Sequence, residues 1–585
     1  MKKHIITLLF FIFTSYFGGI AQINETSMPS IFETSLGKRT STYHETIDYY
    51  KHLSIKHPAV QVFEMADTDS NYPLYVVIFD PAEKHSKNKD LTVTQNKKNL
   101  LLIVNGIHPG EPDGIDATML LFRDYAKGKL PLPENTIIAT IPIYNIGGVL
   151  NRNSTSRTNQ NGPEEYGFRG NARNYDLNRD FIKGDTKNAR AFFEIFHWLD
   201  PDLLIDNHVS NGADYQYVLT HLFTQHNKLD GDLGDYLQTS FIPQFENSLY
   251  KKDYDITPYV NVFNSVPENG FSQFMDSPRY STGYAALFNT LGMIVETLML
   301  KPYKDRVVGT YELMKSFIAI ADADAHKIKS IRRKSFEKYK TGSYYPIIWK
   351  LDSSKTTTLN FKGFEVKMIP SNITGGERLK YFRDKPFTKD VTYYNNFKAV
   401  DSIKIPSAYI IPKGYWNVIE LLKLNKIEFR EIKNDSTLAA EVYRIKSLET
   451  VKSPYEGNYL HYNTEVIKSK ETISISKGDV IVNTQQLGVR YLLETLEPTA
   501  PDSFFNWNFF DAILQQKERF SPYAWEDLAE KFINDNLEIK KKFENKREAE
   551  PEFAKSWYLQ LDWIHKQSPY YEKSHLRYPI IRVGG

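Results

Sequence analysis

Hydrophobic and polar positions along residues 61–330 alternate between short apolar runs and amphipathic stretches. Apolar runs bounded by turn residues predict buried strands at 99–104, 136–142, 202–206 and 292–299. Amphipathic periodicity predicts helices at 116–126, 186–198 and 307–328. Because strands and helices take turns along the chain, we expect an α/β unit with a mixed, largely parallel sheet flanked by helices.

The pattern changes after about residue 335. Short alternating runs at 356–361 and 471–476 predict antiparallel strands, and 416–424 and 487–496 predict short helices. Further helical patterns cover 523–547 and 551–567. We therefore expect two parts: a first unit over residues 22–335, and a β-rich accessory region with a helical tail over residues 336–585.

The N-terminus has the pattern of a signal peptide. Lys2 and Lys3 precede an apolar run from Ile5 to Phe17, and small residues lead to a cleavage point near Ala21. The run is short for a membrane span, which needs about 20 residues. We expect residues 1–21 to be removed and the mature chain, with no membrane span, to be secreted or periplasmic. A signal anchor is the less favoured alternative.

Composition narrows the function classes. Lys and Arg number 73 and Asp and Glu number 71, so the net charge of +2 gives no support to a nucleic-acid or anionic-membrane partner. The absence of cysteine excludes disulfides, cysteine nucleophiles and thiolate metal sites. Any metal must therefore be held by His, Asp or Glu. The HExxH, P-loop, GxGxxG and GxSxG motifs are absent as well.

Three residues are candidate metal ligands. His108 and Glu111 stand three apart in a tight Pro-Gly loop after the strand 99–104, so both side chains can converge on one cation. His208 follows the predicted strand 202–206. Each signal is weak alone, because a surface His beside an unrelated Glu gives the same pattern, and a lone His at a strand end is more often structural.

Two further features carry candidate chemistry. Asp176-Leu-Asn178-Arg179 follows a long polar stretch that contains Arg152, Arg157, Arg169 and Arg173, although a polar surface loop would have the same composition. Glu296 lies inside the apolar run 293–299. A carboxylate there must be paired, desolvated or functional.

Taken in order, these motifs resemble the zinc carboxypeptidase family, the carboxypeptidase A-like metallopeptidases, over roughly residues 40–330. The resemblance implies one Zn²⁺ ion held by His108, Glu111 and His208. It also implies that Glu296 is the catalytic glutamate. Asn178 and Arg179 match the pair that binds the terminal carboxylate of the substrate.

The resemblance also implies roles for Tyr280 and for one of the loop arginines. Tyr280, in Ser277-Pro-Arg-Tyr-Ser-Thr-Gly-Tyr284, falls where the family carries a mobile tyrosine over the substrate. Arg157 is our choice for the arginine that stabilises the oxyanion, with Arg152 or Arg169 as alternatives. Asp206, two residues before His208, is either a hydrogen-bond partner of that ligand or an exposed turn carboxylate.

The resulting hypothesis is an exported, zinc-dependent metallocarboxypeptidase that hydrolyses C-terminal peptide bonds with zinc-activated water, acting on peptides with a free C-terminus. One alternative keeps the metal site and makes the chain an amidohydrolase that deacylates N-acyl amino acids or acts on cell-wall peptides. Another is a catalytically inactive peptide-binding protein.

Overall fold

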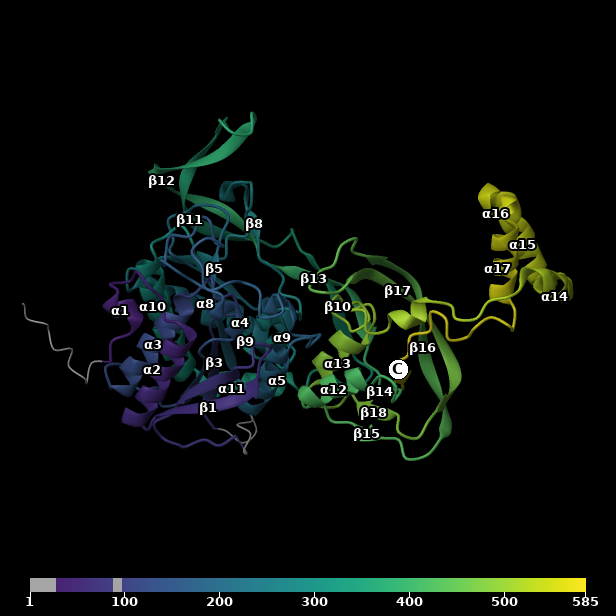
Figure 1. Ribbon diagram of the computed structural model, residues 1–585, viewed down its shortest axis with the longest axis horizontal. Helices are drawn as coiled ribbons and strands as arrows, with labels where there is room; N and C mark the ends of the chain where they lie inside the picture. The colour runs from purple at the N-terminus through teal and green to yellow at the C-terminus, as the bar shows by residue number, and fades with distance from the viewer. Residues whose placement is uncertain (1–27, 88–96, 585) are drawn as a thin grey trace, which may run out of the picture.

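The computed structural model describes residues 28–87 and 97–584 of the chain. The predicted signal peptide lies outside these residues. Figure 1 shows a large α/β unit, a β-rich unit beside it and a cluster of helices joined to the rest by two extended segments. Within the described residues, no helix combines the length and the apolar character needed to cross a bilayer.

A mixed sheet forms the centre of the first unit. In the described part of the chain it has eight strands in the order β1-β2-β4-β3-β5-β9-β6-β7. The strands are β1 (Val60–Asp67), β2 (Pro73–Phe79), β3 (Asn99–Val104), β4 (Thr136–Ile141), β5 (Leu203–Ser210), β6 (Leu219–Phe223), β7 (Ile256–Pro258) and β9 (Leu291–Leu298). The neighbours β4, β3, β5 and β9 are parallel, whereas β2 and β6 join this group antiparallel. The predicted mixed, largely parallel sheet is confirmed.

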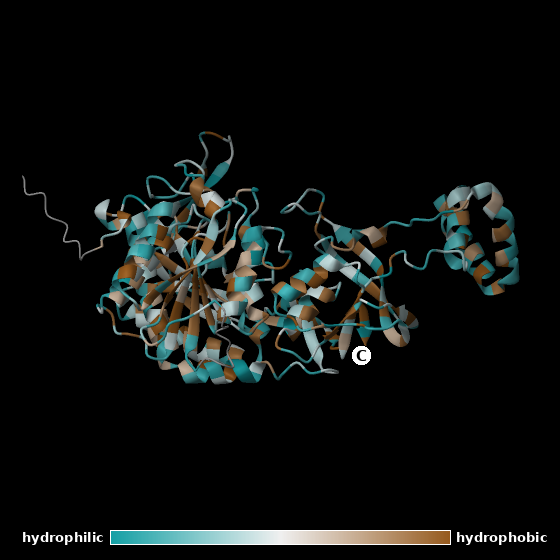
Figure 2. Ribbon diagram, turned by 60° about the horizontal axis from the view of Figure 1, so that its bottom comes forward, coloured by the Kyte–Doolittle hydropathy of each residue, from teal (hydrophilic) through white to brown (hydrophobic). Residues whose placement is uncertain are grey.

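Helices cover the sheet, and its central strands β3 and β4 are mainly apolar. Every residue of β3 and β4 is buried, as expected for parallel strands packed on both faces. Figure 2 shows these hydrophobic strands at the centre of the unit. The main helices are α2 (Tyr43–Lys56), α3 (Asp113–Ala126), α5 (Lys187–Leu199), α10 (Tyr303–Ala323) and α11 (Ala325–Ser335).

The prediction of a single long helix at 307–328 is wrong, because the chain forms two helices, α10 and α11, with a break at Asp324. Asp324 has φ −96° and ψ 12°, outside the helical range, and its carboxylate accepts a hydrogen bond from the Tyr236 hydroxyl at 2.7 Å. This tertiary contact holds the carboxylate at the point where the chain changes direction.

Strand β5 is longer than its sequence pattern predicts. It runs over Leu203–Ser210 and pairs with β9 residue by residue, so that His208 lies opposite Glu296. The expectation that His208 follows the strand is therefore wrong. Continuous pairing with β9 extends β5 through the polar residues Asp206, Asn207 and His208, which the apolar pattern alone does not include in the strand.

The accessory region is β-rich, and a helical tail is inserted before its last strand. Its strands are β10 (Tyr344–Leu351), β11 (Thr357–Pro370), β12 (Glu377–Tyr394), β13 (Phe397–Lys404), β14 (Ala408–Ile411), β15 (Arg430–Glu431), β16 (Ser436–Thr450), β17 (His461–Ile475), β18 (Val480–Asn483) and β19 (Ile581–Val583). Its helices are α12 (Trp416–Leu424), α13 (Val489–Leu496), α14 (Pro522–Asp535), α15 (Leu537–Ala549), α16 (Pro551–Lys555) and α17 (Trp557–Gln567). Helices α14 to α17 form the tail and enclose a small core of their own around Trp525 and Phe543.

The accessory region packs closely on the first unit. Buried side chains on both sides of residue 335 belong to one hydrophobic cluster, in which the rings of Phe288 and Tyr491 stack at 5.9 Å. The buried Arg490 of α13 donates hydrogen bonds to the carbonyl oxygens of Ala286 and Lys228. Strand β12 pairs in parallel with the short β8 (Phe271–Ser272). The domain boundary at residue 335 stays a prediction, and these contacts hold the two parts together.

Candidate active site and metal centre

Three predicted ligands converge in the structure. His108 and Glu111 lie in the turn between β3 and α3, which the Glu111 amide closes by donating to the His108 carbonyl oxygen. His208 reaches them from β5. The Nδ1 atoms of His108 and His208 lie 3.1 Å apart, and Glu111 oxygens lie 3.1 Å from His208 Nδ1 and 3.4 Å from His108 Nδ1. All three residues are buried and form a potential metal-binding group.

The spacing of these atoms fits a zinc ion. Zinc bonds of about 2.0–2.1 Å in a tetrahedron separate two ligand atoms by about 3.3 Å. The observed separations of 3.1–3.4 Å are close to this value. Two imidazoles and one carboxylate are also the donor set that leaves a catalytic zinc with an open position.

Both histidines are oriented by carboxylates. The Nε2 atom of His108 lies 2.9 Å from Asp176 Oδ1, and Nε2 of His208 lies 2.9 Å from Asp206 Oδ2. Such partners leave the opposite ring nitrogen for the metal. Asp206 is fully buried and also accepts a hydrogen bond from Ser281, so it is not an exposed turn residue. The role of Asp176 was missed by the sequence reasoning, although the residue opens the Asp-x-Asn-Arg motif.

Charges around the ligands favour a cation. Burial alone would lower the pKa of His208, but the charges and hydrogen bonds of Asp206 and Glu111 together outweigh it, and the pKa lies well above its ordinary value. Burial alone would raise the pKa of Glu111, but Arg157 and His108 hold it well below its usual range. Negative charge is therefore retained beside the two imidazoles, where a divalent cation would bind.

Glu296 faces the same space from β9. It lies directly across the strand pair from His208 and is partly exposed to a cavity of about 370 Å³. Burial, together with the nearby charge of Glu111, raises the pKa of Glu296 to about 8. The apolar run around it supplies the desolvated surroundings that the sequence predicts.

All of the predicted site residues line this one cavity. Its wall contains His108, Glu111, His208, Glu296, Arg157, Asn178, Arg179 and Tyr280, together with Arg169. Sequence reasoning did not find the other lining residues Val209, Ser210, Asn211, Leu222, Tyr259, Asn261, Phe263, Phe274 and Ile294. Several come from the poorly patterned segment 240–280, which carries no motif that could have identified them.

The arginines of the polar loop divide into two groups. Arg152 and Arg173 do not line the cavity; they donate to the backbone carbonyls of Glu165 and Asp185. Arg157 donates to Glu111 at 2.6 Å, to the Val209 carbonyl oxygen at 2.9 Å and to Gln160.

Arg169 is the most accessible of the three arginines in the cavity wall, which are Arg157, Arg169 and Arg179. Its side chain is 46% exposed, and its Nε donates to Asp176 at 2.9 Å. Its Nη1 lies 3.6 Å from Glu111, beyond normal hydrogen-bond length. Its Nη2 also lies 2.9 Å from Asp176 Oδ2. Among the described residues, Nη1 of Arg169 therefore has no hydrogen-bond acceptor, whereas each of the three guanidinium nitrogens of Arg157 donates a hydrogen bond.

Asn178 and Arg179 lie in a short 3₁₀ turn, and Tyr280 lies beside them. The Asn178 side chain accepts a hydrogen bond from the Ser281 amide at 3.2 Å. The Arg179 guanidinium lies over the Tyr280 ring, 4.6 Å from its centroid. Burial alone would lower the pKa of Arg179, but Asp176 and the neighbouring tyrosines raise it, so the residue is held as a cation.

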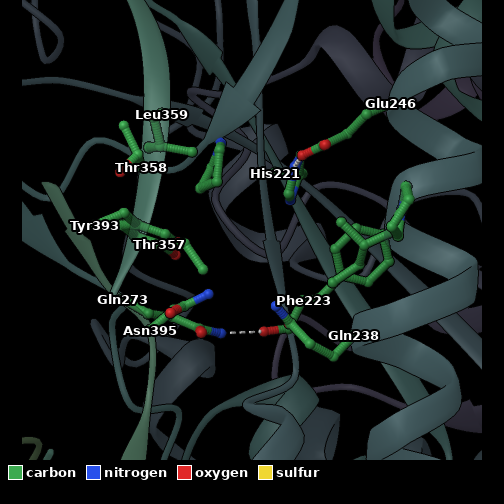
Figure 3. A pocket seen from close by; sticks show the side chains of 13 residues that line it. His221, Phe223, Gln238, Glu246, Gln273, Thr357, Thr358, Leu359, Tyr393 and Asn395 are labelled. Atoms are coloured by element: carbon green, nitrogen blue, oxygen red, sulfur yellow. Dashed lines mark hydrogen bonds and ion pairs between the residues drawn. The ribbon is translucent and has the colours of Figure 1, made fainter. Parts of the chain in front are cut away.

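A second cavity, of about 200 Å³, lies against strand β6, which also contributes to the wall of the first cavity. Figure 3 shows His221 and Phe223 of β6 facing Thr357, Thr358 and Tyr393 of the β11–β12 hairpin. Leu222 between them lines the first cavity, so the two cavities lie on opposite faces of the sheet. His221 bonds to Glu246 at 2.8 Å, and none of the predicted site residues lines this cavity.

Comparisons with known proteins agree with the motifs. No family model matches the chain. Carboxypeptidase 2 of Trichophyton rubrum is 22% identical over 436 residues, covering 70% of this chain and 73% of that protein. Carboxypeptidase 2 of Trichophyton tonsurans is 22% identical over 426 residues, covering 68% and 72%. These matches confirm the resemblance to the carboxypeptidases.

Two of the solved structures that are similar to this chain are named as carboxypeptidases. A metallo-carboxypeptidase from Burkholderia cenocepacia has a TM-score of 0.36 and 14% identity over 49% of this chain and 70% of its own. Carboxypeptidase A from Helicoverpa armigera has a TM-score of 0.37 and 15% identity over 50% of this chain and 75% of its own.

We expect the purified protein to bind one zinc ion per chain and the His208→Ala variant to lose it, because one imidazole and one carboxylate are too few ligands for a stable site. Metal analysis after dialysis measures this. His221→Ala is the matched control, since His221 lies on β6, two strands away from β5 in the same sheet, and faces the other cavity, so this variant should keep the metal. Full zinc occupancy in His208→Ala would exclude His208 as a ligand.

Proposed function

We propose that this protein is a zinc-dependent carboxypeptidase that removes C-terminal residues from peptides. One observation carries the proposal: the three candidate ligands, Glu296 and the Asn178–Arg179 pair line a single cavity. The similarity to fungal proteins named Carboxypeptidase 2 supports it. Its export is part of the proposal and is supported by the signal-peptide pattern of residues 1–21.

His108, Glu111 and His208 would hold the metal. A zinc ion bound by them would act as a Lewis acid and make water a stronger nucleophile at neutral pH. Asp176 and Asp206 keep the two imidazoles in the orientation that directs Nδ1 toward the metal position.

Glu296 is the general base in this proposal. Its carboxylate accepts the proton of the attacking water and then delivers it to the nitrogen of the leaving amine. The β5–β9 pairing places it across from His208, within the same cavity wall. Because Glu296 is on a rigid central strand, it needs no loop movement to stay beside the metal position.

Arg169 is our proposed donor to the oxyanion, in preference to Arg157. Arg157 is already bound to Glu111, Val209 and Gln160, so its role is to hold the ligand Glu111. Arg169 presents a half-exposed guanidinium to the cavity while Asp176 fixes its Nε. A donor with free N–H groups can stabilise the negative charge that develops on the attacked carbonyl oxygen.

Asn178 and Arg179 are the proposed binding site for the terminal carboxylate. A guanidinium donates two parallel hydrogen bonds to a planar carboxylate. Tyr280 stacks on Arg179, so it both limits the movement of the guanidinium and lies where a peptide terminus would enter. This arrangement favours substrates with a free C-terminus.

The Glu296→Gln variant tests the mechanism. We expect it to keep zinc but to lose about 10²- to 10⁴-fold in kcat on peptides, because the amide cannot accept the proton. Glu246→Gln, in the other cavity, is the matched control and should retain activity. Assays on N-acyl amino acids, run in parallel, distinguish a carboxypeptidase from a deacylase. Undiminished turnover in Glu296→Gln would refute its role as base.

Arg179→Ala tests the recognition of the terminus. Hydrogen bonds to a charged group contribute about 1.5–3 kcal/mol, so KM for peptides with a free C-terminus should rise about 10- to 100-fold. The same peptides with an amidated C-terminus provide the control in kinetic assays. An equal effect on both substrates would argue against a carboxylate contact.

Arg169→Ala and Arg157→Ala separate the two arginines. Removing an oxyanion donor costs about 10²- to 10³-fold in kcat, and we expect this loss in Arg169→Ala with unchanged zinc content. Arg157→Ala should instead weaken zinc binding, because Glu111 loses its partner. Kinetics and metal titration of both variants measure this. The reverse assignment is correct if only Arg157→Ala lowers kcat at full zinc occupancy.

A further inference from the structure

A turn of the accessory region contacts Tyr175 and Asp176, which lie beside the candidate active site. Residues 455–458, between β16 and β17, form this accessory turn. Its Glu456 accepts a hydrogen bond from the backbone amide of Asp176 at 2.8 Å. Its Gly457 packs against Tyr175, where a Cβ would lie 2.7 Å from the hydroxyl oxygen. A Cβ at this position would require the Tyr175 side chain to shift.

The accessory turn has a residue at its first central position that this type of turn does not usually carry. Tyr455 and Asn458 exchange two backbone hydrogen bonds, and the residues between them have φ values of 48° and 78°. A turn of this type favours Asn, Asp or Gly at both central positions. The first central position is instead occupied by Glu456. Glutamate is not among the residues that favour left-handed backbone, so its presence here indicates a role for its side chain.

Aromatic and ionic contacts fix the accessory turn. The Tyr455 ring stacks on Trp507 at 6.1 Å with an interplanar angle of 18°. The Arg279 guanidinium lies over both rings, at 5.6 Å and 5.0 Å from their centroids, and pairs with the buried Asp502 at 2.7 Å. These contacts hold the backbone of the turn that carries Glu456 in place.

Asp176 connects the accessory turn to the catalytic groups. Its carboxylate lies 2.9 Å from His108 Nε2, 2.9 Å from Arg169 Nε and 3.8 Å from Arg179 Nη2. Asp176 also lies in a loop rather than in a strand or helix. Movement of its backbone would thus disturb one candidate ligand and two substrate-facing arginines together.

We propose that Glu456 is a positioning residue of the active site: it holds Asp176, and through Asp176 it orients His108, Arg169 and Arg179. The inference rests on the proposed function for its catalytic consequence. It makes the accessory region part of the active site rather than an independent binding module.

The test compares three variants of the full chain. Glu456→Ala removes the acceptor, Glu456→Gln retains an amide oxygen in its place, and Glu449→Ala is the matched control. Glu449 is an exposed residue of β16 whose side chain accepts a hydrogen bond from Asn463, also within the accessory region. Two readouts are used: zinc affinity by chelator competition, and hydrogen exchange of the peptide that contains Asp176.

We expect Glu456→Ala to bind zinc about 3- to 10-fold more weakly, less than the 10- to 100-fold typical when a direct partner of a ligand is lost. Exchange at Asp176 should be faster, and KM for peptides with a free C-terminus should rise more than for amidated ones. Glu456→Gln should restore most of each property. A Glu456→Ala variant indistinguishable from Glu449→Ala in both readouts would overturn the proposal.

The two proposals can fail separately. If the unsubstituted protein binds no zinc and cleaves no peptide, the proposed function fails. Hydrogen exchange still decides the role of Glu456, because it needs neither metal nor substrate. Faster exchange at Asp176 in Glu456→Ala alone supports positioning, and unchanged exchange refutes it.

Discussion

The candidate site depends on the register between β5 and β9. Pairing of these parallel strands sets His208 opposite Glu296. Because side chains alternate between the two faces of a sheet, a slip of one residue would move either group to the opposite face. The neighbouring strand β3 then supplies the turn with His108 and Glu111. The chemistry thus relies on backbone hydrogen bonds at the centre of the most deeply buried sheet.

Buried charges near the site are stabilised by ion pairs. Arg306 of α10 is fully buried and pairs with Asp113 at 2.8 Å, two residues beyond Glu111, and Asp113 also accepts from Thr297 of β9. Unpaired charges at these depths would cost several kcal/mol each. The same network that satisfies the charges joins α3, α10 and β9, and thereby fixes Glu111 relative to Glu296.

The sequence allowed the core strands and a set of candidate residues that share one cavity to be predicted, because both have local signals. The apolar runs 99–104 and 136–142 became β3 and β4, and the ordered motifs led to residues that share one cavity. Groups whose function depends on distant contacts gave no such signal. The extension of β5 depends on its pairing with β9, and the contact of Asp176 with His108 joins residues far apart in the sequence. The difference between Arg157 and Arg169 is visible only in their hydrogen bonds and exposure.

The accessory turn is one of the contacts that join the accessory region to the first unit. Arg490 satisfies backbone carbonyls of the first unit, and the packed rings of Tyr455 and Trp507 support Glu456 from the accessory side. A loop as long as 151–185, with little regular structure, would not by itself hold Asp176 to the precision that metal ligation requires. Gly457 packs closely against Tyr175 of this loop, next to Asp176. If Glu456 has the proposed positioning role, the accessory region supplies rigidity to the candidate metal centre although it contains none of the candidate catalytic residues.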